Sequence, residues 1–297
     1  MTMTGSTPCQ IRRHSPAITR RLSATRWAAP LSIGLAAMVT SPAIGADQVA
    51  TDVSAKYKLS FNGFDVGNYY FKSKFDARSY SANSQADVSA MFGAFKWRGS
   101  IETSGAMQAQ KPRPAGYVMT FKTKSKTGSV TLDFNAAGVK TVTLVPSKPP
   151  NPEAVPLSGN HLKNVFDPLS AILAMTNKPG GKPCDQRVPI FDGKARFDLA
   201  LSYKGTEKIT DKKPSGQPSE LLVCRVKYLP IAGHKAKDFD NPWVDYNNIE
   251  IAFRPIPTAG VYVPYRIAIP TTLGTAMMQA EAVTITSPDH PQIALTQ

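Results

Sequence analysis

Hydrophobic and polar residues alternate along much of the chain after residue 50. In 195–203 (ARFDLALSY) large apolar side chains occupy every second position, namely Phe197, Leu199, Leu201 and Tyr203. A period of two places successive side chains on opposite faces of a half-buried β-strand. The same pattern recurs at 55–61, 67–75, 116–125, 128–134, 221–229, 247–253 and 260–269. At this spacing it predicts roughly a dozen strands.

Turn residues separate these strands without any linker long enough to divide the chain into domains. Asn62-Gly63 and Asp192-Gly193 are typical of tight hairpins. The prolines cluster in connections, above all in 146–156 and 211–218, which are predicted to be loops. We therefore predict a mainly β protein with a single large antiparallel sheet, curled into an open or half barrel, and one short buried helix. Residues 47–297 are expected to form this single β-rich domain.

The short helix is expected at 167–175 (DPLSAILAM), where the alternation stops. Asp167 is a suitable N-cap, Pro168 fits the first helical position, and Asn177 and Pro179 end the pattern. Between them the helix is apolar nearly all round, so Ile172 and Leu173 are expected to be buried. Such a helix either lines or closes a hydrophobic cavity inside the curled sheet, or packs as ordinary core.

Residues 1–46 contain five arginines and no acidic residue, and end in the apolar run 27–46. This arrangement predicts a cleaved signal peptide, with the cut after Gly45 or Ala46, and a periplasmic protein. A membrane anchor is disfavoured because prolines interrupt the run, while a mitochondrial presequence would share its composition. Arg20-Arg21 matches twin-arginine export poorly, and no cysteine follows the run to carry a lipid anchor.

The chain has three cysteines, and Cys9 lies in the segment expected to be removed. The remaining two, Cys184 and Cys224, are an even number in an oxidising compartment, so we predict a disulfide between them. The alternative is a redox or metal pair, but there is no CxxC motif and His161, His234 and His290 show no ligand spacing.

The chain is basic. Removing residues 1–46 takes away five arginines, lowers the net charge from +14 to +9 and leaves 251 residues. In the periplasm a basic surface meets anionic lipids or other envelope polymers, not nucleic acid. Basic residues alternate in FKTKSKT, so Lys122, Lys124 and Lys126 are expected to share one strand face as contacts for an anionic partner. The competing interpretation is a solvated face that protects a sheet edge.

The sequence lacks the motifs of the common enzyme classes, including the nucleophile elbow, zinc-protease, phosphate-loop and dinucleotide-binding motifs. Two acidic features remain. Asp238, Asp240 and Asp245 surround Trp243 and are interpreted as a solvated turn or a cation site, although their spacing fits no calcium loop. Asp192 precedes Gly193 and is predicted to make a hairpin turn instead of acting as a catalytic acid. We predict no catalytic residue, metal or cofactor.

Several of these features together resemble the bacterial "domain of unknown function 3108" family. The resemblance rests on VGNYYF (66–71), DPLSAILAM (167–175), a cysteine separated by six residues from FDGKARFDL (191–199), the second cysteine, and VYVPYRIAIPTTLG (261–274). The family-like positions are Gly67, Cys184, Asp192, Gly193, Arg196, Cys224, Pro264 and Arg266, and Ala195 and Tyr265 depart from the family pattern. The resemblance implies location and architecture, and it assigns no activity.

Three functional hypotheses follow. The first is an exported periplasmic protein without enzymatic activity that holds a lipid or another amphiphile inside the curled sheet during envelope maintenance. The second is a periplasmic scaffold or interaction protein with a filled core and no ligand. The third is an enzyme, which is disfavoured because no nucleophile with a histidine partner and no metal cluster is evident. The mature chain is expected to have no transmembrane segment.

Overall fold

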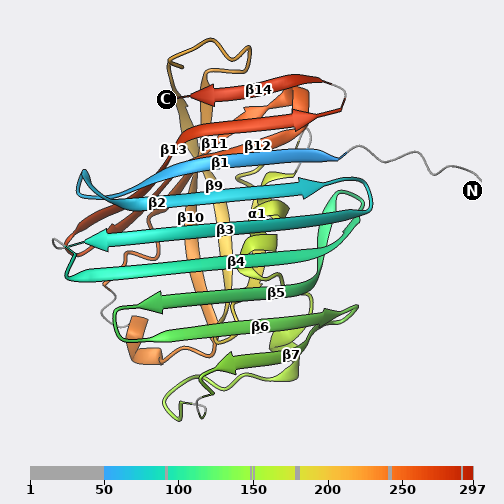
Figure 1. Cartoon of the computed structure of the whole chain (residues 1–297). Coiled ribbons are helices and arrows are strands. Elements are labelled where there is room, and N and C mark those ends of the chain that lie inside the picture. Colours follow the sequence, from blue (N-terminus) through green and yellow to red (C-terminus); the bar gives the residue numbers. More distant parts are fainter. Residues whose placement is uncertain are drawn as a thin grey trace, which may run out of the picture. The chain divides into compact units, whose positions relative to one another are not determined.

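The structure is a computed structural model that describes residues 50–296, except 91–92, 148, 150, 178–180, 240–242 and 289. Within this range fourteen strands form one antiparallel sheet, in the order β7-β6-β5-β4-β3-β2-β1-β13-β12-β11-β10-β9-β8, and β14 pairs with β13 outside this path. The sheet does not close on itself. The predicted fold class is therefore confirmed (Figure 1).

The sheet consists of two meanders. The first runs from the middle of the sheet to one edge through β1 (Thr51–Phe61), β2 (Phe64–Phe75), β3 (Ser79–Ala90), β4 (Phe95–Gln108), β5 (Lys111–Thr123), β6 (Thr127–Asn135) and β7 (Gly138–Val145). The second runs from the other edge back to the middle through β8 (Gln186–Phe191), β9 (Arg196–Lys208), β10 (Glu220–Ala232), β11 (Ile249–Ile256), β12 (Val261–Thr271), β13 (Gly274–Ser287) and β14 (His290–Thr296).

The two meanders meet along a central seam, where β1 pairs with β13 from Asp52 opposite Thr286 to Phe61 opposite Ala276. The connection between the meanders contains a short 3-10 helix, η1 (Gly159–Leu162), and then the helix α1 (Pro168–Thr176). Two further 3-10 helices, η2 (Ala236–Phe239) and η3 (Pro257–Ala259), lie in loops of the second meander.

Helix α1 lies against the inner face of the curl and contacts strands of both meanders, namely β3, β4, β5, β8 and β12. Asp167 is its N-cap and accepts hydrogen bonds from the backbone N–H groups of Leu169 and Ser170, as predicted. Asn177 is the C-cap, whereas Pro179 lies outside the described residues. Leu173 is buried as predicted, but the same expectation for Ile172 is wrong, since Ile172 is only partly buried. Both side chains border the pocket described below.

The Asp167 carboxylate is fully buried in a cluster of hydroxyl groups. It accepts hydrogen bonds from Ser170 Oγ and from Thr103 Oγ1 on β4, and the Tyr80 hydroxyl on β3 lies 2.7 Å from Ser170 Oγ. Burial raises the pKa of Asp167, and the hydrogen bonds partly oppose that shift. The cluster ties the start of α1 to β3 and β4, so the helix is fixed in position as well as packed.

Cys184 and Cys224 lie at disulfide distance, with their Cα atoms 5.1 Å apart. Cys184 follows α1 in the chain, and Cys224 is fully buried in β10. Both belong to a hydrophobic cluster with Ala171 and Met175 of the helix. A bond here fixes the segment after α1 to the middle of the second meander.

Candidate functional site: an apolar pocket beside helix α1

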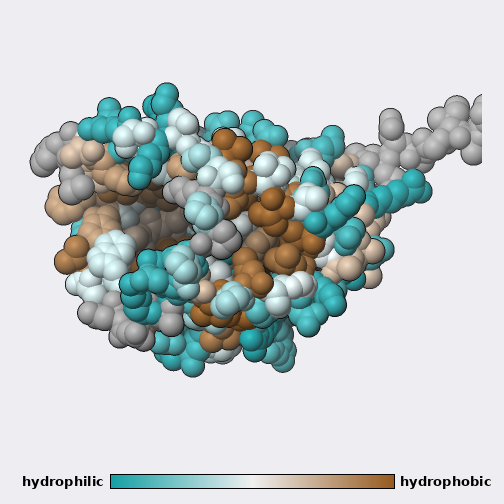
Figure 2. Space-filling view, turned by 90° about the horizontal axis from the view of Figure 1, so that it is seen from below, coloured by the Kyte–Doolittle hydropathy of each residue, from teal (hydrophilic) through white to brown (hydrophobic). Residues whose placement is uncertain are grey.

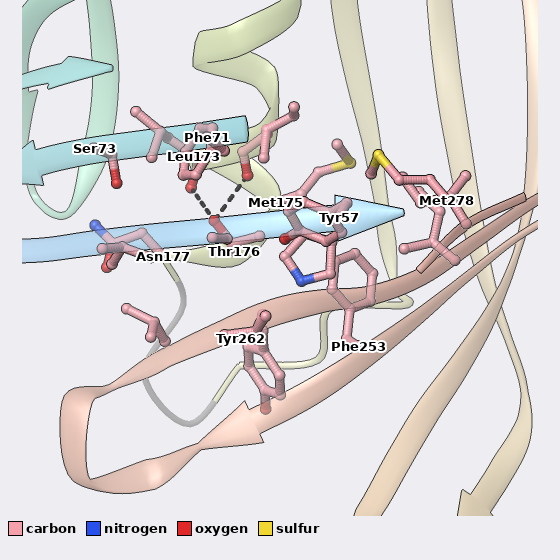
Figure 3. Close-up of a pocket in the computed structure, with 18 of the residues that line it drawn as sticks. Tyr57, Phe71, Ser73, Leu173, Met175, Thr176, Asn177, Phe253, Tyr262 and Met278 are labelled. Atoms are coloured by element: carbon pink, nitrogen blue, oxygen red, sulfur yellow. Dashed lines mark hydrogen bonds between the residues drawn. The ribbon is translucent and has the colours of Figure 1, made fainter. Parts of the chain in front are cut away.

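An apolar pocket lies between α1 and the inner face of the sheet (Figure 3). Its walls come from six elements that are far apart in the chain: β1, β2, α1, β11, β12 and β13. The side chains labelled in Figure 3 are Tyr57, Phe71, Ser73, Leu173, Met175, Thr176, Asn177, Phe253, Tyr262 and Met278. The pocket therefore spans the seam between the two meanders.

The alternation of β1 and β2 explains why these residues face the pocket. Val53, Ala55 and Tyr57 occupy every second position of β1, and the odd-numbered residues from Tyr69 to Phe75 do so in β2. Because side chains two apart share a strand face, all of these point to the concave side. The lysines between them point outward, and Lys56 pairs there with Glu281 at 2.8 Å. The predicted strand pattern thus creates the apolar wall directly.

The pocket is open at its mouth and narrow inside. The cavity volume is about 70 Å³. Pockets that enclose a whole small molecule commonly measure roughly 300–1,000 Å³, so this cavity is small. It suits a slender apolar group such as part of a single unbranched chain.

The walls are uncharged. Among the described residues that line the pocket, none is Lys, Arg, His, Asp or Glu. Burial raises the pKa of both Tyr57 and Tyr69, so their phenol groups remain neutral at physiological pH. An ion in this space would lose its hydration without gaining a partner, so the site favours neutral and apolar groups.

The few polar groups gather toward one end, where Ser73 and Asn177 lie in Figure 3, whereas Tyr57, Phe253 and Met278 lie toward the other. Thr176 Oγ1 donates to the Ile172 carbonyl at 2.9 Å, and the Tyr262 hydroxyl donates to the Gly181 carbonyl at 2.9 Å. Ser73 Oγ is buried and has no hydrogen-bond partner among the described residues. The pocket is therefore amphipathic along its length.

Lys122, Lys124 and Lys126, the predicted contacts for an anionic partner, lie close together, but only Lys122 lies in a strand. Lys122 belongs to β5, whereas Lys124 and Lys126 lie in the turn between β5 and β6. The expectation that all three share a strand face is wrong, because Thr123 ends the strand: its N–H donates to the Lys126 carbonyl at 2.7 Å and closes the turn. All three side chains are exposed.

Large apolar side chains are exposed at the same end of the sheet, and we call them the apolar rim: Phe64, Phe95, Trp243 and Leu273. Asn62, beside Phe64, accepts the N–H of Thr275 at 2.9 Å and donates to the Leu273 carbonyl, so these two turns are neighbours. Thr272 N–H donates to the Trp243 carbonyl. Figure 2 shows a hollow and exposed hydrophobic side chains toward this left-hand end.

The aspartates considered as a catalytic acid or as cation ligands form turns wherever the structure describes their side chains. Asp192 Oδ1 accepts the N–H groups of Lys194 and Ala195, as predicted for a hairpin turn. Asp245 accepts from Asn247 and Asn248 within its own turn. Asp240 and the side chain of Asp238 lie outside the described residues. In the part of the chain that the structure describes, no group of three or more acidic, His or Cys side chains is placed to hold a metal.

The family-like positions have structural explanations that sequence reasoning did not provide. A Cβ on Gly67 would meet the Asp87 carbonyl oxygen at 1.9 Å, so the strands β2 and β3 require glycine there. Arg196 pairs with the buried Asp198, and Arg266 pairs with Glu207 at 2.8 Å. Pro264 alone among these positions lines the pocket. The pocket residues themselves were missed, because their positions in the chain carry no local motif.

No helix in the described residues is long and apolar enough to cross a membrane. No curated protein and no solved structure matches the chain. One family model matches residues 56–281, which is most of the chain and includes both cysteines, the helix and all the described pocket residues except Val53 and Ala55. The chain therefore belongs to the family described as "Protein of unknown function (DUF3108)".

Proposed function

We propose that the protein is an exported, periplasmic binding protein without enzymatic activity that holds the chain of a lipid or another amphiphile in the pocket beside α1. The pocket is the observation that carries this proposal, because it is apolar, uncharged and open to solvent. The acid-free N-terminal segment supports export. Two cysteines at disulfide distance suit the same oxidising compartment.

The test is to look for a ligand and then to fill the pocket. Native mass spectrometry of protein purified from its own host should detect a bound amphiphile, and the emptied protein should bind the apolar dye 1-N-phenylnaphthylamine. Met278→Trp places a large ring in the pocket and should abolish dye binding. Val118→Trp is the control, because Val118 is exposed on β5 outside the pocket. Both variants are checked by thermal unfolding.

If neither a co-purified amphiphile nor displaceable dye binding is found, the proposal fails. The scaffold with a filled core and no ligand then becomes the better explanation.

We further propose that the protein binds an anionic lipid surface through the end of the sheet that carries a lysine cluster, which consists of Lys96, Lys122, Lys124 and Lys126. Lys96, Lys122, Lys124 and Lys126 are exposed there, and none has an ion-pair partner among the described residues. Arg98 lies opposite Lys122 in the ladder, although Asp87 pairs with it. Aromatic and aliphatic side chains beside lysines match the two parts of a lipid interface, the acyl boundary and the anionic headgroups.

The lysine contribution is tested with two charge-matched triple variants and vesicles that contain an anionic phospholipid. Lys122→Glu/Lys124→Glu/Lys126→Glu should weaken binding at low salt far more than Lys208→Glu/Lys212→Glu/Lys213→Glu, which changes the net charge equally at other exposed sites. Wild-type binding should fall as salt shortens the Debye length from about 10 Å at 0.1 M to about 3 Å at 1 M. If both triple variants lose vesicle binding equally, the net charge alone accounts for binding and the lysine cluster is not a specific contact.

A further inference from the structure

One polar group that lines the pocket, the hydroxyl of Ser73, is buried without a hydrogen-bond partner among the described residues. Ser73 is only 5% exposed, and its hydroxyl faces the pocket. Buried hydroxyl groups in proteins nearly always hydrogen-bond to protein atoms or to water, because a buried hydroxyl without a partner has lost its hydration and gained no hydrogen bond in its place. Ser84 Oγ and Thr296 Oγ1 are also buried without a partner among the described residues, but of the three only Ser73 lines the pocket, where a ligand can reach it.

Two of the three neighbouring polar groups have no donor left for a ligand that enters the pocket. Thr176 donates to the Ile172 carbonyl, Asn177 Nδ2 donates to the Gln110 carbonyl at 3.3 Å, and Tyr262 donates to the Gly181 carbonyl. Thr176 and Tyr262 have therefore used their single donors within the protein, whereas Asn177 keeps one N–H of its side-chain amide. Ser73 Oγ remains able both to donate and to accept.

The residues that line the pocket determine whether a charged or a neutral ligand group is favoured beside Ser73. Among the described lining residues only the tyrosines are ionisable, so none of these residues supplies a cation to balance a carboxylate or a phosphate. A charged group could not lie beside Ser73 without a large desolvation penalty, whereas a neutral ester or hydroxyl oxygen could. The narrow apolar space toward Tyr57 and Met278 then accommodates the rest of the chain.

Resting on the proposed function, we infer that the pocket takes a single-chain amphiphile whose neutral oxygen, from an ester or a hydroxyl, hydrogen-bonds to Ser73. A charged headgroup, if the ligand has one, stays outside the mouth. The site therefore discriminates against a free fatty acid, whose charged carboxylate sits directly on the chain.

The experiment compares two ligands of equal chain length on the mature protein. Monolauroylglycerol, a neutral ester, and laurate at pH 8 are used below their micelle concentrations to displace 1-N-phenylnaphthylamine. The ester should displace the dye at a concentration at least about tenfold lower than laurate, as expected when a buried polar group prefers a neutral partner. Equal potency of the two ligands would overturn the inference.

The role of Ser73 is tested with matched serine variants. Ser73→Ala should lower the affinity for the ester about tenfold, which is the effect of losing one hydrogen bond. It should leave the affinity for the dye unchanged. Ser73→Thr keeps the hydroxyl and should restore ester binding. Ser84→Ala is the control, because Ser84 is also buried and unpaired, and lies on the neighbouring strand β3 without lining the pocket.

The outcomes separate this inference from the proposed function. If the ester is preferred but Ser73→Ala binds it as well as wild type does, or if Ser84→Ala has the same effect as Ser73→Ala, the assignment to Ser73 is wrong while the binding function stands. If wild-type protein binds neither dye nor ester, both are wrong.

Discussion

At the scale of single residues, the most constrained charge is Arg254 on β11, whose side chain is fully buried. Its guanidinium forms two parallel bonds to Asp211, at 2.5 and 2.7 Å, and also donates to Ser215 Oγ and the Pro218 carbonyl. All three partners belong to the proline-rich loop 211–218. A planar, bidentate donor of this kind fixes the loop on the sheet, although the loop has no regular structure.

This pair predicts a specific pH dependence. The Arg254 guanidinium holds the pKa of Asp211 below its ordinary value of 3.8. Because the pKa is lower in the folded state, the stabilisation is complete above the unfolded pKa and is lost as pH falls below about 4. Asp211→Asn should lower the free energy of unfolding by about 3–5 kcal/mol at pH 7, since it leaves a buried cation unpaired.

The measurement is urea unfolding of wild type and Asp211→Asn at pH 7, 5, 4 and 3. The difference between the two proteins should shrink as Asp211 becomes protonated. A difference that stays constant over this range would show that the carboxylate charge does not contribute. Arg254→Met/Asp211→Asn, which removes both charges, should recover part of the loss.

At the scale of elements, two neighbouring residues of α1 differ in burial. Both Leu173 and Ile172 border the pocket and pack in the main hydrophobic cluster, but Leu173 is buried whereas Ile172 is only partly buried. Leu173→Asp should therefore cost about 3–5 kcal/mol and prevent the protein from accumulating. Ile172→Asp should cost less, because the carboxylate can turn toward the mouth, but should abolish dye binding. Thermal unfolding and dye titration of the two variants check this, and equal loss of stability would contradict it.

The cysteine pair gives a second prediction for the same region. Cys184 and Cys224 are 40 residues apart, so a bond between them should contribute about 4 kcal/mol by restricting the unfolded chain. Alkylation without reductant, followed by peptide mapping of protein taken from the periplasm, should find no free thiol at either position. Cys184→Ala/Cys224→Ala should lower the melting temperature. Two freely alkylated thiols would refute the pairing.

Comparison of elements shows what the sequence could predict. Helix α1 was evident because Asp167 and Pro168 are local signals, and β9 was evident from its alternation, although Tyr203 proves to be exposed. β3 is hard to recognise because its inward positions hold small residues such as Ala82 and Ser84. The pocket could not be predicted, because β1 meets β13, and through it β12, only by pairing between residues more than two hundred positions apart.

At the scale of the whole molecule, export remains a prediction. Expression of the full chain in its host should release a periplasmic protein that begins at Ala46 or Asp47, as read from its intact mass. Replacing the five arginines of the first 46 residues by serine should reduce the amount released, because the basic region would be lost. Recovery of wild-type chain that still carries residues 1–46 would contradict a cleaved signal.

The central seam has a consequence for the order of folding. β1 follows directly after the segment proposed to be removed, yet its partner β13 is almost the last strand to be synthesised. Pairing over such a separation carries a large loop-closure entropy and is slow. During that delay both seam strands are unpaired edges, which are the sites where chains aggregate. The unfolded chain is therefore most prone to aggregation before the seam closes. Under the proposed export, a periplasmic chaperone would protect it most at that stage.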